Sequence, residues 1–160
     1  MRRLGFFLLA CAAAVALQST VVGLLEIAGT RPNLPLLLLL AFSLRLSILE
    51  SIGLAFLVGL MADLAMGAPV GLSSLGFTLA AFLVRVPTQE WVHVSYQRMA
   101  AIWAVGAAVY EGLVYSILCL GSELGLMGAL LRFTLPAIAY DVAFGVLILA
   151  ALPQAWWRRL

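Results

Sequence analysis

Three acidic residues, Asp63, Glu111 and Asp141, lie inside segments that are otherwise almost entirely apolar. A carboxylate at the centre of a bilayer costs about 2.5–3.5 kcal/mol or more unless protein groups shelter it. Such residues can mark a proton or cation pathway, and they can equally join helices by hydrogen bonds to hydroxyl, tyrosine or backbone groups. The sequence leaves both roles open and favours the structural one.

The three acids are expected at different depths. At about 1.5 Å per helical residue, Asp63 lies about 5 Å and Asp141 about 12 Å from the outer ends of their segments. Glu111 lies about 17 Å into its segment, close to the middle of a membrane. Glu111 is therefore the costliest of the three carboxylates and the best candidate for a dynamic role.

Asp63 belongs to a stripe of small residues. On a helix, Gly59, Asp63 and Gly67 share one face, and Gly71 follows after a further four residues. Small side chains let a second backbone approach closely, either from the same chain or from a partner. Since Gly67–Gly71 contains Pro69 and forms a turn, we expect Asp63 to fasten the hairpin between the third and fourth segments.

No motif for nucleophilic, metal-dependent or phosphate-binding catalysis is present in the sequence. Ser73 and Ser74 are expected to cap the fourth helix, and the lone His93 makes a metal site improbable. Cys11 and Cys119 fall in apolar runs and are expected to be buried free thiols. We therefore expect a protein that is not an enzyme and that needs no cofactor or metal.

Composition identifies the environment of the chain. Of 160 residues, 65% are hydrophobic and 10% are charged, against roughly 25% charged in a soluble domain. All nine basic residues are arginines, the net charge is only +2, and no basic cluster with interleaved aromatic residues suits nucleic acid. The sequence predicts an all-α, polytopic membrane protein with one integral-membrane domain over residues 1–160.

Six apolar segments are candidates for membrane spans. The first resembles a signal peptide, but it continues past Cys11 and is therefore expected to be an uncleaved span. The second and third are short for a membrane core that needs about 20 helical residues, so together they form either one broken helix or a tight hairpin. The segments are Leu4–Leu25, Leu34–Leu44, Ile52–Met66, Leu72–Val86, Met99–Leu120 and Phe133–Leu152.

The arginines distinguish five spans from six. With six spans and both termini inside, seven arginines lie on the cytoplasmic side, and only Arg31 and Arg132 lie outside. With five spans, four of the seven move outside, against the positive-inside bias. Six spans with cytoplasmic termini are therefore predicted. The seven are Arg2, Arg3, Arg45, Arg85, Arg98, Arg158 and Arg159.

These features together resemble the MreD family of bacterial rod shape-determining membrane proteins. The resemblance covers Arg31 to about Val84 and extends more weakly over the chain. It rests first on the Pro-polar-Leu start of the second segment, with Asn33 where the family commonly has Asp. It rests also on the spacing of the glycines around Asp63 in the third segment and the turn after it. The motif residues are Gly53, Gly59, Asp63, Gly67, Pro69 and Gly71.

The resemblance implies a non-enzymatic, multi-pass scaffold in the bacterial cytoplasmic membrane, with a compact six-helix fold similar to the substrate-binding subunits of vitamin transporters. Proteins of the family partner MreC. With MreB filaments and the RodA–PBP2 synthase, they guide peptidoglycan synthesis and maintain rod shape. On this hypothesis, a small-residue groove receives the membrane helix of MreC. The alternative is a transport subunit that binds a small solute or lipid and uses the three intramembrane acids.

Overall fold

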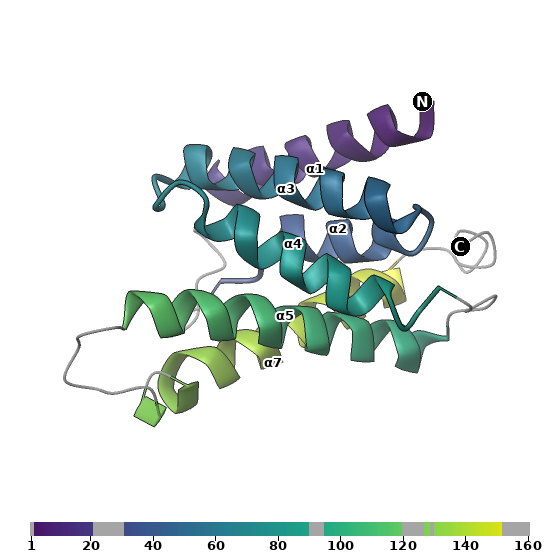
Figure 1. The fold of residues 1–160 in the computed structure, drawn as a ribbon. Coiled ribbons are helices and arrows are strands. Elements are labelled where there is room, and N and C mark those ends of the chain that lie inside the picture. Colours follow the sequence, from purple (N-terminus) through teal and green to yellow (C-terminus); the bar gives the residue numbers. More distant parts are fainter. Residues whose placement is uncertain (1, 21–30, 90–94, 120–126, 129, 152–160) are drawn as a thin grey trace.

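The computed structural model describes residues 2–20, 31–89, 95–119, 127–128 and 130–151, and these residues form helices without strands. Six α-helices and one short π-helical segment, η2, account for the fold (Figure 1). Their bounds are α1 Arg2–Thr20, α2 Leu34–Ser43, α3 Ile48–Met66, α4 Leu72–Arg85, α5 Tyr96–Leu118, η2 Leu130–Thr134 and α7 Leu135–Ala151. The predicted all-α fold is confirmed.

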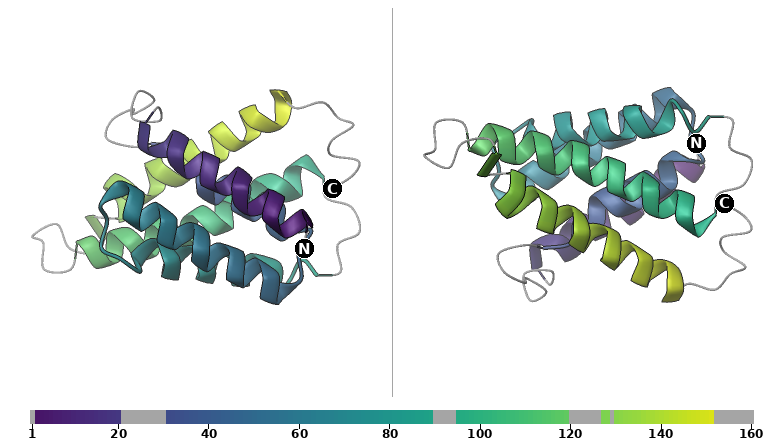
Figure 2. Two further views of the ribbon diagram at one scale, coloured as in Figure 1. Left: turned by 90° about the horizontal axis from the view of Figure 1, so that it is seen from above. Right: turned by 90° about the horizontal axis from the view of Figure 1, so that it is seen from below.

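Successive α-helices run in opposite directions, so the bundle has two ends (Figures 1 and 2). One end holds the turn 67–71 between α3 and α4, and the other holds the turn 44–47 between α2 and α3. Helix α4 packs between α3 and α5, and α5 packs on α7. Helix α1 covers α2 and α3. Of the predicted arginine positions, Arg158 and Arg159 lie outside the described residues.

The second and third apolar segments form a helical hairpin, and the alternative of one broken helix is wrong. Ser47 accepts a hydrogen bond from the Glu50 amide, and the Glu50 carboxylate accepts one from the Ser47 amide. This capping box starts α3 at Ile48. The helix therefore begins four residues before the apolar run that predicted it.

Helix α2 is the shortest of the six and begins inside the bundle. Its ten residues extend about 15 Å, roughly half of a bilayer core. Pro32 and Pro35, at its start, are both fully buried. By length and composition, two described helices are suited to cross a membrane, Ile48–Met66 and Gln97–Leu118, and the other apolar helices are shorter. The other four helices are shorter than a membrane span requires, so helix length does not support the predicted six spans.

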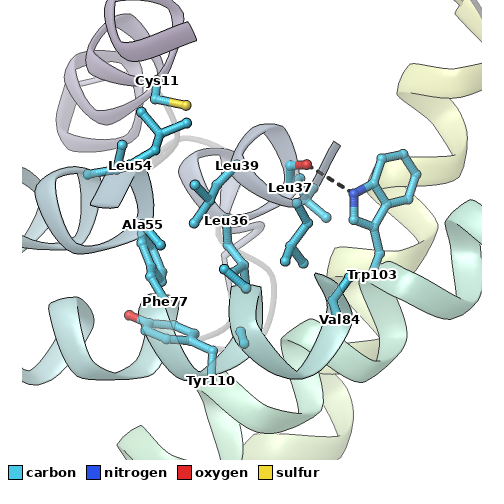
Figure 3. Close-up of a cluster of buried hydrophobic side chains, with 14 of the residues drawn as sticks. Cys11, Leu36, Leu37, Leu39, Leu54, Ala55, Phe77, Val84, Trp103 and Tyr110 are labelled. Carbon is cyan, nitrogen blue, oxygen red and sulfur yellow. Dashed lines mark hydrogen bonds between the residues drawn. The ribbon is translucent and has the colours of Figure 1, made fainter. Parts of the chain in front are cut away.

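The leucines of α2 form the centre of the core (Figure 3). Leu36, Leu39 and Leu40 are completely buried, and the indole Nε1 of Trp103 donates to the Leu37 carbonyl oxygen at 3.0 Å. That bond ties α5 to α2 at the middle of the bundle. Cys11 is a buried free thiol in the same core, as predicted. Cys119 is also a free thiol, but it is partly exposed, so its predicted burial is wrong.

Glycines allow the closest helix contacts. A Cβ built on Gly59 would lie 2.5 Å from the Ser74 Cα, so α3 and α4 touch backbone to backbone there. A Cβ on Gly145 would lie 2.5 Å from the Trp103 ring, and one on Gly106 would overlap the Leu40 side chain. By contrast, a Cβ on Gly53 would meet nothing within 4 Å.

This difference predicts opposite effects of one methyl group. Gly59→Ala forces the backbones of α3 and α4 apart and should lower the free energy of unfolding by about 1–3 kcal/mol. Gly53→Ala, in the same helix, should leave stability unchanged or raise it by about 0.5–1 kcal/mol. Thermal unfolding of both variants in the same detergent measures the difference, and equal midpoints would contradict the close packing of α3 on α4.

Candidate functional site: two buried helix starts

Asp63 caps the start of α4. Its side chain is completely buried, and its oxygens accept amide hydrogen bonds from Gly71 at 2.8 Å, Ser73 at 2.9 Å and Ser74 at 3.4 Å. The first amides of a helix have no partner within the helix, and their partial positive charge favours an anion. A carboxylate on α3 thus supplies the acceptors that α4 needs, and it joins the two helices.

The turn that brings α4 to Asp63 depends on two glycines. Gly67 ends α3 with φ 66°, and Gly71 precedes α4 with φ 100°, both in the left-handed region that favours glycine. The Gly67 amide also bonds back to the Asp63 carbonyl oxygen. Pro69 is exposed between them. The predicted turn is therefore present, and the structural role expected for Asp63 agrees with its hydrogen bonds.

The predicted capping of α4 by serine side chains is wrong. Both backbone amides are bonded to Asp63, and the two hydroxyl groups point to other helices. The Ser74 hydroxyl donates to the Phe56 carbonyl oxygen of α3, and the Ser73 hydroxyl shares a hydrogen bond of 3.2 Å with the Tyr110 hydroxyl of α5. The serines instead extend the contacts of α4 to both neighbouring helices.

A second carboxylate, Asp141 of α7, holds the buried start of α2. Its Oδ1 accepts the Asn33 amide at 2.6 Å, and the Asn33 side chain accepts the Leu36 amide. The Gln18 side chain of α1 accepts the Leu34 amide and donates to the Pro32 carbonyl oxygen. Because this helix start is buried, its polar groups need protein partners, and α1 and α7 supply them.

Tyr110 connects the two helix starts. Besides its bond to Ser73, its hydroxyl lies within reach of the Asn33 side chain. Its ring packs on Phe77, with ring centroids 4.9 Å apart (Figure 3). The ring also covers Gly76. Tyr110 therefore lies between the buried polar groups around Asp63 and those around Asp141. We call this set the polar layer: Gln18, Asn33, Asp63, Ser73, Tyr110 and Asp141.

The third acid, Glu111, is buried beside this layer, with 7% of its surface exposed, and Asp141 is the charged group that acts on it. In the described part of the chain, no group of three His, Cys, Asp or Glu side chains is placed to hold a metal ion. Glu111 and Asp141 are thus close enough to act on each other electrostatically, whereas Asp63 is bonded to the start of α4.

The glycine stripe is not an open groove. Gly59 and Asp63 are both buried against α4, whereas Gly53 and Gly67 are exposed. Of the two uses that the stripe allowed, packing within the chain accounts for Gly59 and Asp63. Sequence reasoning missed the partner role of Gln18, whose only signal was a polar interruption in the first apolar run.

An apolar helical bundle in which side chains of other helices bond the buried helix starts, and in which glycines allow close helix contacts, has the features of a helical membrane protein. The family model for the rod shape-determining protein MreD matches residues 1–152, so the chain belongs to the MreD family. Among curated proteins and among solved structures, no match to the chain was found.

Removal of the Asp63 carboxylate should destabilise the bundle strongly. Asp63→Ala leaves three amides of α4 without an acceptor and should lower the free energy of unfolding by about 2–4 kcal/mol. Asp63→Asn keeps one carbonyl oxygen and should lose less. Denaturant unfolding in detergent gives both values. The matched control is Glu50→Ala, an exposed capping acid expected to cost about 1 kcal/mol, and an equal loss in both alanine variants would contradict the assignment.

Proposed function

We propose that this protein is a non-enzymatic scaffold of the cell-elongation machinery, which binds MreC and organises peptidoglycan synthesis to maintain rod shape. The match to the MreD family over residues 1–152 carries this proposal. MreB filaments and the RodA–PBP2 synthase complete the assembly that we propose. One rigid bundle over residues 1–160 in the bacterial cytoplasmic membrane would present fixed helix faces to these partners.

We also propose that the chain crosses this membrane six times, with both termini in the cytoplasm, and that α2 itself covers about half of the membrane core in its span. The alternating helix directions support this topology. Arg45, Arg85 and Arg98 lie at the end of the bundle that holds the turn 44–47. Arg31 precedes the start of α2, toward the opposite end of the bundle. Under the positive-inside bias, the 44–47 end faces the cytoplasm and the 67–71 end faces outward.

The membrane helix of MreC would dock on the outer face of α5. Ala101, Val105, Ala108 and Gly112 share one face of this helix, the first three are exposed, and a Cβ on Gly112 would meet nothing within 4 Å. This smooth stripe lies on one of the two helices long enough to span a membrane. Small residues allow a second helix to pack closely where the hydrophobic effect cannot drive association.

The outer face of α3 suits a partner helix less well. It carries exposed bulky side chains, with Leu49 81%, Phe56 52% and Leu64 67% exposed. Bulky side chains hold a second helix at a distance, and lipid chains solvate them equally well. The contrast in side-chain size therefore favours α5 as the MreC surface.

A bulky residue on α5 should abolish this contact. Ala108→Phe should reduce co-purification of MreC with the tagged protein by at least about tenfold, which corresponds to about 1.4 kcal/mol. The same change at exposed Ala13 of α1 is the matched control and should leave co-purification unchanged. Quantitative pull-down in mild detergent measures both.

Absence of MreC binding to the unmodified protein would contradict the scaffold proposal itself. Binding that survives Ala108→Phe but fails with Ala13→Phe would contradict the docking surface alone. Rod shape in cells that carry each variant as their only copy provides a second measurement, and cells with Ala108→Phe should become rounded.

A further inference from the structure

Asp141 has one carboxylate oxygen without a partner. The residue is completely buried, its Oδ1 accepts the Asn33 amide at 2.6 Å, and its Oδ2 has no hydrogen bond. A buried acceptor without a donor costs about 1–3 kcal/mol. A donor is therefore expected at Oδ2, and the geometry of α5 and α7 identifies one.

Two contacts fix how α5 lies along η2 and α7. The Trp103 ring covers Gly145, and Tyr115 stacks on Phe133 with ring centroids 5.5 Å apart. The helices run in opposite directions (Figure 1), so residue 103 is level with 145, and 115 is level with 133. By this alignment Glu111 is level with Ala137, one helical turn or about 6 Å along the axis from Asp141.

The two acidic side chains lean toward each other across this distance. Side chains on an α-helix tilt toward its N-terminus. In antiparallel neighbours, Glu111 therefore leans toward the level of Asp141, and Asp141 leans toward the level of Glu111. Both side chains are buried, and Ala107, level with Asp141, is small enough to leave room between the helices.

The surroundings give the two acids different roles. Asp141 lies at the positive end of α2 and accepts a short amide hydrogen bond, and both features stabilise a carboxylate. Among the described residues, no backbone amide donates to Glu111; the ionisable groups close enough to act on it electrostatically are Asp141 of α7 and the hydroxyls of Tyr110 and Tyr115. Two buried carboxylates on neighbouring helices, at levels about one helical turn apart, cannot both be ionised in an apolar bundle without a large cost.

We propose that Glu111 carries a proton and donates it in a hydrogen bond to Oδ2 of Asp141, so that the two acids together bind one proton at the start of α2. The bond gives the unpartnered oxygen its donor and removes the repulsion between the acids. It also links α5 to α7 and, through Asn33, to α2. This proton site is independent of MreC binding.

Infrared spectroscopy of the whole protein in lipid nanodiscs tests the site. At neutral pH, we expect a protonated carboxyl band that shifts in D2O and shifts again when glutamate, but not aspartate, carries a carboxyl ¹³C label. Glu111→Gln should remove the band, because the variant has no carboxyl group at this position. Its side-chain amide can still donate a hydrogen bond to Asp141, so the fold should be retained. Asp63→Asn is the matched control and should keep it.

Several results would overturn the proposal. A band that shifts with labelled aspartate places the proton on Asp141, and no band at all means that both acids are ionised, with a water molecule or a cation at Oδ2. A thermal midpoint that rises with Na⁺ or K⁺ at constant ionic strength, in the absence of the band, would identify the cation.

Thermal unfolding against pH provides a second test in case a variant fails to fold. The folded protein holds a proton that the unfolded chain releases above the ordinary glutamate pKa of about 4.3. Stability should therefore fall as pH rises from mildly acidic values through neutral, until the folded protein also releases the proton. Glu111→Gln should flatten this dependence relative to the unmodified protein. A midpoint of the unmodified protein that does not fall over this range would contradict the proposal.

Discussion

The fold depends on the need to satisfy two helix starts inside an apolar bundle. At a buried helix start, the first amides have no water to bond and require acceptors from elsewhere in the chain. Asp63 of α3 provides them for α4, and Asp141 of α7, with Gln18 of α1 and Asn33 itself, provides them for α2. Each acid thereby binds one helix to another.

This requirement explains why a ten-residue helix can occupy the centre of the bundle. The leucines of α2 fill the core, and the Trp103 indole holds its middle from α5. Because α2, α4 and α7 occupy the inner sides of α5, the small residues Ala101, Ala108 and Gly112 are left on its outer side. Internal packing thus shapes the surface at which we propose that MreC binds.

Local signals in the sequence predicted the elements well, because glycine turns and apolar runs act over a few residues. The turn 67–71 and the hairpin around it followed from Gly67, Pro69 and Gly71. The early start of α3 also had a local signal, the Ser47–Glu50 capping box, which the apolar run concealed. The partners of Asp141 had none, since its bond to Asn33 spans 108 residues and depends on how α7 packs. The apolar periodicity of a sequence predicts which face of a helix is buried, but it does not predict which other helix packs on that face.

Hydrogen exchange at the start of α4 tests the central claim most directly. If Asp63 is the acceptor for this helix start, the Gly71 and Ser73 amides should exchange slowly in the reconstituted protein. They should exchange much faster in Asp63→Ala, which has no side-chain acceptor, while the Leu75 amide, bonded to the Gly71 carbonyl oxygen, keeps most of its protection. Rapid exchange of Gly71 and Ser73 in the unmodified protein would contradict the account.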